Sequence, residues 1–482
     1  MAADIVVSPV GNDLNGLGTV EAPYATIRRA LDAASPGDTI SLRNGVYDGG
    51  LNIDIDNLTI RSFPGEWGVI QSPVDDPQQG SVVRYLNDTE GGRLENVEIV
   101  GGYWYGVKLE DWWDNPGPDA IRRGASDITI VGCKIHDTGW DAVKIVPGAD
   151  DITIENNEIF NSGRRLTQSA DGIDNNNGDR MVARNNYLHD IPGVGILTTG
   201  GTHDSLVEGN LITDTQGAGI TVGFYSELEW MDQDQNPELY TSFNTVARNN
   251  VVVNAGQAGI GIYASYHPIV EHNTLVNPAD EAQAPLQLGG VDIWVSDSLP
   301  FQHVASVDPV IRNNLITLDA DNLTRLFDAR FQSYVGTLTV DGNLFHAPSV
   351  VGARFIDRNV SGDATPEQHW SQWLAAGHDT HGVLQDPLLD AQFHLTSTSP
   401  ARDAALVDDS TAIDFDGQAR SGGKADIGAD EFVLGAVRPT PPPAFGAPSL
   451  EFTARAAHAL EGSAVEVVVR RNGFAGDQLT VD

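Results

Sequence analysis

The chain has 482 residues, room for one large domain and a smaller one, with 67 acidic and 28 basic residues and a formal net charge of −39. So acidic a surface repels nucleic acid and anionic lipid, and no run of eighteen apolar residues occurs, so we expect neither nucleic-acid binding nor membrane insertion. The single cysteine, Cys133, excludes an intramolecular disulfide.

Residues 5–50 predict a short helix followed by a strand. Apolar residues recur at helical spacing within EAPYATIRRALDAASPGDTISLRNGVY, namely Ile27, Ala30, Leu31 and Ala34. The Pro-Gly pair behind them ends the helix. An element of this kind suits the end of a repetitive fold, where it covers apolar side chains that no further repeat can bury.

Eight later segments can be aligned so that one column holds an amide in all but one of them. The column contains Cys133, Asn157, Asn186, Asn210, Asn250, Asn273, Asn314 and Asn343. Its members are 24, 29, 24, 40, 23, 41 and 29 residues apart. A basic period near 24 residues with two long excursions predicts a solenoid with loops inserted at fixed corners. We expect two strands per rung, with the amide column on the first, and a core-packing role for Cys133.

The second predicted strand of each rung follows the pattern x-small-apolar-x-apolar. Its period of two sends one column inward: Val107, Val143, Ile173, Ile196, Ile220 and Ile260. Most insertions leave after this strand, so we expect them to wall a groove. They span residues 110–126, 164–169, 224–243 and 278–307.

Charged side chains occupy the outward positions of two neighbouring second strands. Asp141 is expected to stack on Asp171, with about 4.8 Å between rungs. One column over, Lys144 is expected to stack on Asp174. Stacked carboxylates repel unless a cation lies between them, and oxygen ligands favour Ca²⁺. Either the three aspartates form a cation site, or each is a turn residue and the lysine pair is a surface ion pair.

Aromatic and imidazole side chains supply candidate sugar-binding residues. Exposed aromatic rings stack on sugars, and the insertions and strand ends provide Trp112, Trp113, Tyr225 and Tyr263. The turns before two second strands carry His136 and His189, with Phe160 between them. These residues either bind sugar in the groove or pack the loops onto the solenoid.

The rungs run to about residue 345, and a different composition follows. Residues 365–376, TPEQHWSQWLAA, predict a short helix, and two polar segments then close the domain. PTPPPAFGAP (439–448) is a proline-rich linker. We predict three units: a solenoid domain (1–436), a linker (437–448) and the beginning of a β-sandwich domain (449–482).

The opening GNDLNGLGTVEAPYATIRRALDAASPGDTISLRNGVY resembles the start of right-handed parallel β-helix polysaccharide lyases, among them pectate lyases, alginate lyases and chondroitinase B. The resemblance covers about residues 5–435 and implies an all-β fold, a right-handed parallel β-helix with an N-terminal cap helix. The alternating residues 449–482 resemble the start of a Calx-β domain.

The segment DGID with the preceding Asp141 resembles the calcium site of pectate lyases that use a lysine base. This resemblance implies Asp141, Asp171 and Asp174 as Ca²⁺ ligands, while a further ligand position is Ala170 here.

The catalytic base departs from that pattern. Those pectate lyases place their lysine on later rungs, whereas this chain has no lysine between residues 145 and 423, so the base would be Lys144 or Lys108. Alginate lyases and chondroitinase B pair a lysine with an arginine, a role that the resemblance gives to Arg164 or Arg165.

The expected function is cleavage of a uronic-acid-containing polysaccharide, of the alginate or pectate type, by β-elimination. We expect a monomer outside the cell, exported through a removed or C-terminal signal, since MAADIVV has neither a basic nor an apolar leader region. One alternative is a glycoside hydrolase. A second is a mannuronan C5-epimerase, whose active-site Asp matches Asp174 although Asn175-Asn176 replace Pro-His. A third is a non-catalytic carbohydrate-binding surface protein.

Overall fold

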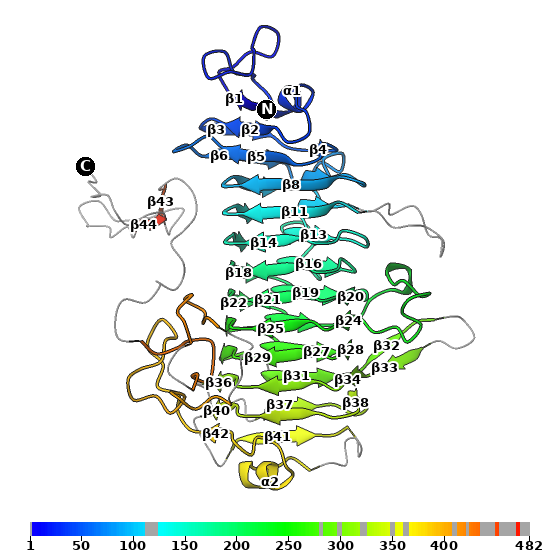
Figure 1. Cartoon of the computed structure of the whole chain (residues 1–482), viewed down its shortest axis with the longest axis vertical. Coiled ribbons are helices and arrows are strands. Elements are labelled where there is room, and N and C mark those ends of the chain that lie inside the picture. Colours follow the sequence, from blue (N-terminus) through cyan, green and yellow to red (C-terminus); the bar gives the residue numbers. More distant parts are fainter. Residues whose placement is uncertain are drawn as a thin grey trace, which may run out of the picture.

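The computed structural model describes residues 2–110, 124–278, 283–295, 301–318, 325–347, 352–359, 366–406, 412–420 and 424–433, with the backbone of 449–452 and 469–472. Strands stack along one axis into three long parallel sheets, with α1 (Ile27–Leu31) near one end and α2 (Trp370–Ala375) at the other (Figure 1). The predicted right-handed parallel β-helix and both short helices are confirmed. In the described ranges, no helix is long and apolar enough to cross a membrane.

Each rung of the solenoid visits the three sheets in turn. Sheet 1 contains β1 (Asp4–Val7), β2 (Thr39–Leu42), β5 (Leu58–Ser62), β8 (Glu90–Glu95), β11 (Ser126–Val131), β14 (Thr153–Glu155), β17 (Val182–Arg184), β21 (Leu206–Glu208), β25 (Val246–Arg248), β29 (Ile269–Glu271), β35 (Val310–Arg312) and β39 (Thr339–Asp341). Sheet 2 contains β3 (Gly45–Asp48), β6 (Gly68–Ser72), β9 (Glu98–Gly101), β12 (Lys134–His136), β15 (Glu158–Phe160), β18 (Tyr187–Ile191), β22 (Leu211–Thr215), β26 (Val251–Val253), β30 (Thr274–Val276), β36 (Leu315–Thr317), β40 (Leu344–His346) and β42 (Val383–Leu384). Sheet 3 contains β4 (Leu51–Ile53), β7 (Ser81–Tyr85), β10 (Tyr105–Leu109), β13 (Val143–Ile145), β16 (Ile173–Asn176), β19 (Ile196–Thr199), β23 (Ile220–Val222), β27 (Ile260–Tyr263), β31 (Leu286–Gly289), β37 (Arg325–Ala329) and β41 (Arg354–Asp357).

Shorter elements decorate these sheets. A fourth parallel sheet lies at the corner between sheet 3 and sheet 1 and contains β20 (Thr202–His203), β24 (Ser242–Phe243), β28 (Ser265–Tyr266), β34 (Ser306–Val307) and β38 (Tyr334–Val335). The insertions carry the 3₁₀ helix η1 (Leu228–Trp230) and the antiparallel pair β32 (Val291–Ile293) and β33 (Gln302–Val304). Strands β43 (Ser449–Phe452) and β44 (Val469–Asn472) also pair antiparallel. The Calx-β-like domain stays a prediction.

The expectation of two strands per rung is wrong, because the first predicted strand is two strands joined by a sharp corner. The amide column lies in that corner, between sheet 1 and sheet 2. The residue before each member has a left-handed backbone, with φ between 51° and 71°. This position holds residues that tolerate such a backbone, namely Gly132, Asn156, Asn185, Gly209, Asn249, His272, Asn313 and Gly342.

The corner turns the amide side chains into the interior, where they form a continuous ladder. The Oδ1 atom of Asn210 accepts hydrogen bonds from the backbone and side-chain amides of Asn186, both at 3.0 Å. The Nδ2 atom of Asn210 donates to Ala183 O and to Asn250 Oδ1, both at 2.9 Å. The same pattern runs from Asn157 to Asn343 with every member buried.

The inward column of sheet 3 forms the core together with inward residues of the other sheets. All six predicted residues are fully buried and share one register: Val107, Val143, Ile173, Ile196, Ile220 and Ile260. At the N-terminal end Ile27 and Ala30 of α1 are buried, which supports the predicted cap. At the far end Trp373 of α2 is buried and donates to Asp379, which continues the ladder from Asn343.

The described residues of 385–433, namely 385–406, 412–420 and 424–433, are here called the C-terminal segment and lie along the outer side of sheet 2 (Figure 1, orange). Phe415 and Ala429 pack with Leu211, Val251 and Val276 of that sheet. The described part of the segment contains no helix or strand, so side-chain packing and polar contacts hold it in place.

Candidate active site

The acidic cluster forms on sheet 3, where three neighbouring strands are in register. Lys144 of β13 lies opposite Asp174 of β16 and opposite Lys108 of β10. Asp141 precedes β13, and its Oδ1 accepts a hydrogen bond of 3.0 Å from the backbone amide of Asp171. The stacking predicted from the columns is therefore present.

Three carboxylates and one ammonium converge at this point. Oxygen atoms of Asp141, Asp171 and Asp174 lie within 4.8 Å of one another. The Nζ atom of Lys144 forms an ion pair with Asp174 and lies 4.0 Å from Oδ2 of Asp141. The backbone amide of Val194 donates to Oδ1 of Asp171 at 2.7 Å, which fixes that carboxylate.

The cluster is buried rather than spread over an open surface, since Asp141 is 0% exposed and Lys144 6% exposed. Burial raises the pKa of Asp171 to about 7, and the neighbouring Asp174 charge acts in the same direction. Burial also raises the pKa of Asp141 well above its usual range. Burial alone would lower the pKa of Lys144, but the carboxylates of Asp174 and Asp141 outweigh burial and raise it. Lys144 is therefore an ammonium in the absence of a further cation.

The donor set fits a hard divalent cation. Oδ2 of Asp141 and Oδ1 of Asp174 are buried and accept no hydrogen bond from any residue that the structure describes. Buried acceptors normally have a partner, and three carboxylates against one lysine leave excess negative charge. Oxygen ligands of this kind match Ca²⁺. Ala170 provides no side-chain ligand.

Lys108, the alternative base, lies one rung from Lys144 and has different partners. Its Nζ donates to Oε1 of Glu110 at 3.3 Å, and Oε2 of Glu110 lies 3.0 Å from Nε of Arg84. Burial lowers the pKa of Lys108, an effect that Glu110 opposes. Arg84 lies opposite Lys108 in register, so three basic residues occupy successive rungs of one column.

An aromatic wall beside the cluster contains residues that sequence reasoning did not assign to the site. The ring of Trp140 lies 6.0 Å from that of Tyr105 and 5.8 Å from that of Trp104. Tyr105 is buried, which raises its pKa, and it interacts electrostatically with Lys144. The signal was available, because Tyr105 precedes Asp141 and Asp171 in the same sequence column.

Arg165 belongs to this aromatic wall rather than to the acidic cluster. Its guanidinium carbon lies 3.8 Å from the ring centroid of Tyr103 and 4.0 Å from that of Trp104, and its Nε donates to Tyr103 O at 2.9 Å. Arg164 is exposed and forms an ion pair with Asp137 at 3.3 Å.

His136 and His189 lie on sheet 2, not on the sheet that carries the acidic cluster. Their rings stack on Phe160 at centroid distances of 4.6 and 4.7 Å. Nδ1 of His136 is 2.8 Å from Asp137, and its Nε2 is 3.1 Å from Glu98. Burial lowers the pKa of His136, but these two carboxylates outweigh burial and raise it. The two imidazoles and Phe160 form one continuous stack on sheet 2. Sugar binding by His136 and His189 stays a prediction.

The remaining predicted sugar-binding residues are dispersed. Tyr225 is 41% exposed in the 224–243 insertion, and Tyr263 lies at the end of β27 with its ring close to Gly261. Trp112 and Trp113 lie outside the described residues. A hollow of about 410 Å³ occurs several rungs further along, where Tyr240, His303 and Tyr334 are among its lining residues. It is not adjacent to the acidic cluster.

Comparisons with known proteins agree with the fold. The protein-family model named "Right handed beta helix region" matches residues 120–305. Pectate lyase PEL9 of Emericella nidulans is 31% identical over an alignment of 134 residues, and the match covers 24% of this chain and 32% of that protein. The chain thus matches about a third of the length of this relative.

Two solved structures extend the likeness over most of the chain. The pectate lyase Pel9A is 14% identical with a TM-score of 0.52, covering 89% of this chain and 96% of the other. XylC in complex with xylose is 12% identical with a TM-score of 0.50, covering 89% and 98%. At these identities the likeness shows a right-handed parallel β-helix.

Proposed function

We propose that the protein is a lyase that cleaves a uronic-acid-containing polysaccharide, of the pectate type, by β-elimination. The observation that carries the proposal is Lys144 among the buried carboxylates of Asp141, Asp171 and Asp174 on one face of the solenoid. The similarity of one segment to a pectate lyase favours pectate over alginate as the first substrate to test.

In this cluster the aspartates would bind the cation, and the lysine would accept the proton. Asp141, Asp171 and Asp174 would hold Ca²⁺, which when bound neutralises the substrate carboxylate and acidifies the proton on C5. Once the charge of the three carboxylates is balanced, burial becomes the dominant influence on Lys144 and lowers its pKa. A neutral Lys144 then accepts the C5 proton.

The elimination balances without a further reactant. The C5–H electron pair becomes the C4=C5 double bond, the bond from C4 to the glycosidic oxygen breaks, and that oxygen takes a proton from solvent. In this proposal Arg165, held over Tyr103 and Trp104, contacts an anionic group of the bound chain. The basic column of Arg84, Lys108 and Lys144 offsets the repulsion between an acidic protein and an acidic polymer.

The test is the ultraviolet absorbance of unsaturated products from polygalacturonate, alginate and glycosaminoglycans, each with Ca²⁺ and with EDTA. We expect a calcium-dependent signal on polygalacturonate and a loss of about 10²–10⁴-fold in Lys144→Gln, the range for a general base. Lys134→Gln is the matched control, because Lys134 also lies near a carboxylate, 4.0 Å from Glu158, but on sheet 2. Undiminished turnover by Lys144→Gln would refute the assignment of the base, and sugar release without unsaturation would indicate hydrolysis.

A further inference from the structure

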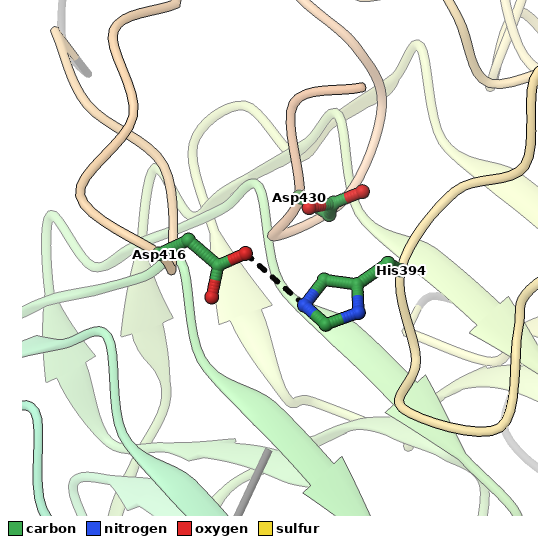
Figure 2. Close-up of side chains that lie close together, drawn as sticks. All are labelled: His394, Asp416 and Asp430. Atoms are coloured by element: carbon green, nitrogen blue, oxygen red, sulfur yellow. Dashed lines mark ion pairs between the residues drawn. The ribbon is translucent and has the colours of Figure 1, made fainter. Parts of the chain in front are cut away.

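A second group of potential metal ligands lies in the C-terminal segment. His394, Asp416 and Asp430 come from three separate stretches of chain, and Figure 2 shows their side chains pointing toward one another. One ligand atom from each lies within 4.8 Å of the others. This site is on the outer side of sheet 2 and is independent of the acidic cluster on sheet 3.

The hydrogen bonds of these residues leave atoms available at the centre of the group. Asp430 is 4% exposed, and its Oδ2 accepts a hydrogen bond of 2.7 Å from the backbone amide of Leu395. Its Oδ1 is buried and accepts no hydrogen bond from the residues that the structure describes, and the same holds for Oδ1 of Asp416. Buried carboxylate oxygens are rarely left in this state without an ion or a water molecule.

His394 supports the same conclusion. It is 4% exposed, and its Nε2 forms an ion pair of 3.0 Å with Oδ2 of Asp416 (Figure 2, dashed line). The two atoms lack the alignment of a hydrogen bond. Ligands that lie about 2.1 Å from a cation are about 3.0 Å apart at the right angles of an octahedral site and about 3.4 Å apart in a tetrahedral site. The spacing of these two atoms therefore suits neighbouring positions in one coordination sphere.

The surroundings contain more negative than positive charge. Asp414, Asp426 and Glu431 are buried close to this group. The nearby guanidinium of Arg420 already has other partners, with Nη1 3.5 Å from Glu431 and Nη2 donating to Gly428 O at 2.8 Å. A divalent cation at the group would offset this excess.

We propose that His394, Asp416 and Asp430 bind a divalent cation of the Zn²⁺ or Mn²⁺ class, which fastens the C-terminal segment to the β-helix. An imidazole with two carboxylates suits these ions, whereas Ca²⁺ takes oxygen ligands.

The positions of the three ligands explain how the cation would act. Each ligand directly follows an apolar residue that packs with sheet 2, namely Phe393, Phe415 and Ala429. The cation would thus join three anchoring points of a segment that has no regular secondary structure in its described part. Metal binding would add to the stabilisation that this segment obtains from packing and polar contacts.

The test is metal binding by the whole chain after removal of bound ions with a chelator. Zn²⁺ and Mn²⁺ are titrated separately by calorimetry, and bound metal is counted by mass spectrometry. Asp430→Asn keeps an oxygen for the Leu395 amide but loses the carboxylate, and His394→Gln removes the imidazole. His303→Gln is the matched control, because His303 lies 2.7 Å from Asp292 and belongs to no group of three ligands in the described residues.

We expect both ligand variants to bind one ion fewer per chain than the wild type, or to bind it at least about 100-fold more weakly, while His303→Gln matches the wild type. Zn²⁺ should also raise the melting temperature of the wild type by about 2 °C or more, and that of the ligand variants less. Unchanged stoichiometry and affinity in Asp430→Asn would overturn the proposal. So would a wild-type chain that binds neither Zn²⁺ nor Mn²⁺ at micromolar concentration, a result that does not depend on any variant folding.

Discussion

The interior amide ladder should carry a large share of the stability of the solenoid, and Asn210→Ala tests this directly. The substitution removes four hydrogen bonds, two donated by Asn210 and two that it accepts from Asn186. At about 1 kcal/mol of net stabilisation each, their loss costs about 4 kcal/mol. One of these four bonds is donated by the buried backbone amide of Asn186, and leaving that amide without an acceptor costs about 1–3 kcal/mol in place of about 1, so the total is about 4–6 kcal/mol.

Cys133→Ala is the matched control, because Cys133 occupies the same column and is equally buried. Its backbone amide donates to Asn157 in the ladder, and this bond survives the substitution. The loss of the thiol leaves only a small cavity, for which we expect about 1 kcal/mol. Urea unfolding, monitored by circular dichroism, gives the denaturation midpoint of each variant. If the dependence of the unfolding free energy on urea concentration is the same for all variants, the shift in midpoint reports the change in stability. If Asn210→Ala costs no more than Cys133→Ala, the ladder does not stabilise the fold as argued.

Three further predictions concern a tight turn at Gly223, the ion pairs of His136 and the stacking of Arg165 on aromatic rings. Gly223→Ala should lower the melting temperature strongly, since Gly223 has φ of 75° and an added Cβ would lie 1.9 Å from the carbonyl oxygen of Tyr263. Glu98→Gln should lower the pKa of His136 in an NMR titration, because one of the two carboxylates that raise it is lost. The stability that protonated His136 provides is present below its ordinary pKa and is lost as the pH rises through the raised value, so this variant should flatten that part of the pH–stability curve. An unmoved His136 pKa would contradict this. Arg165→Lys should lose about 0.5–2 kcal/mol of unfolding free energy with the aromatic stack. Unchanged stability would refute this contribution of the stack, and lost turnover at unchanged stability would leave Arg165 only the contact with the bound chain proposed above.

The rungs could be predicted because, in a parallel solenoid, residues that are one repeat apart in the sequence lie next to each other on neighbouring strands. Once the amide column was aligned, the stacking of Asp141 on Asp171 and of Lys144 on Asp174 followed. The third strand of each rung could not be read in the same way. Strands such as β12 have only three residues, and the corner before β12, Gly132-Cys133, does not interrupt the apolar alternation.

The contacts made by the insertions could not be predicted from the repeat. Arg165 meets Tyr103 across 62 residues, and no repeat relates the loop of one to the strand end of the other. The group of His394, Asp416 and Asp430 was missed for a related reason, because it lies in an irregular segment where no period predicts which residues meet.

In the proposed function, the basic column and the acidic cluster together would allow so acidic a protein to bind an acidic polymer. Arg84, Lys108 and Lys144 occupy three successive rungs, about 4.8 Å apart, and Asp174 follows on the next rung. A polyanion lying along the axis would meet positive charge over three rungs and then the carboxylates. At that boundary Lys144 forms an ion pair with Asp174. In the proposed function, a cation that balances the carboxylates would release Lys144 from this pair to act on the substrate. Catalysis and binding of the polymer should therefore both require the cation, and salt should weaken binding through the three basic rungs.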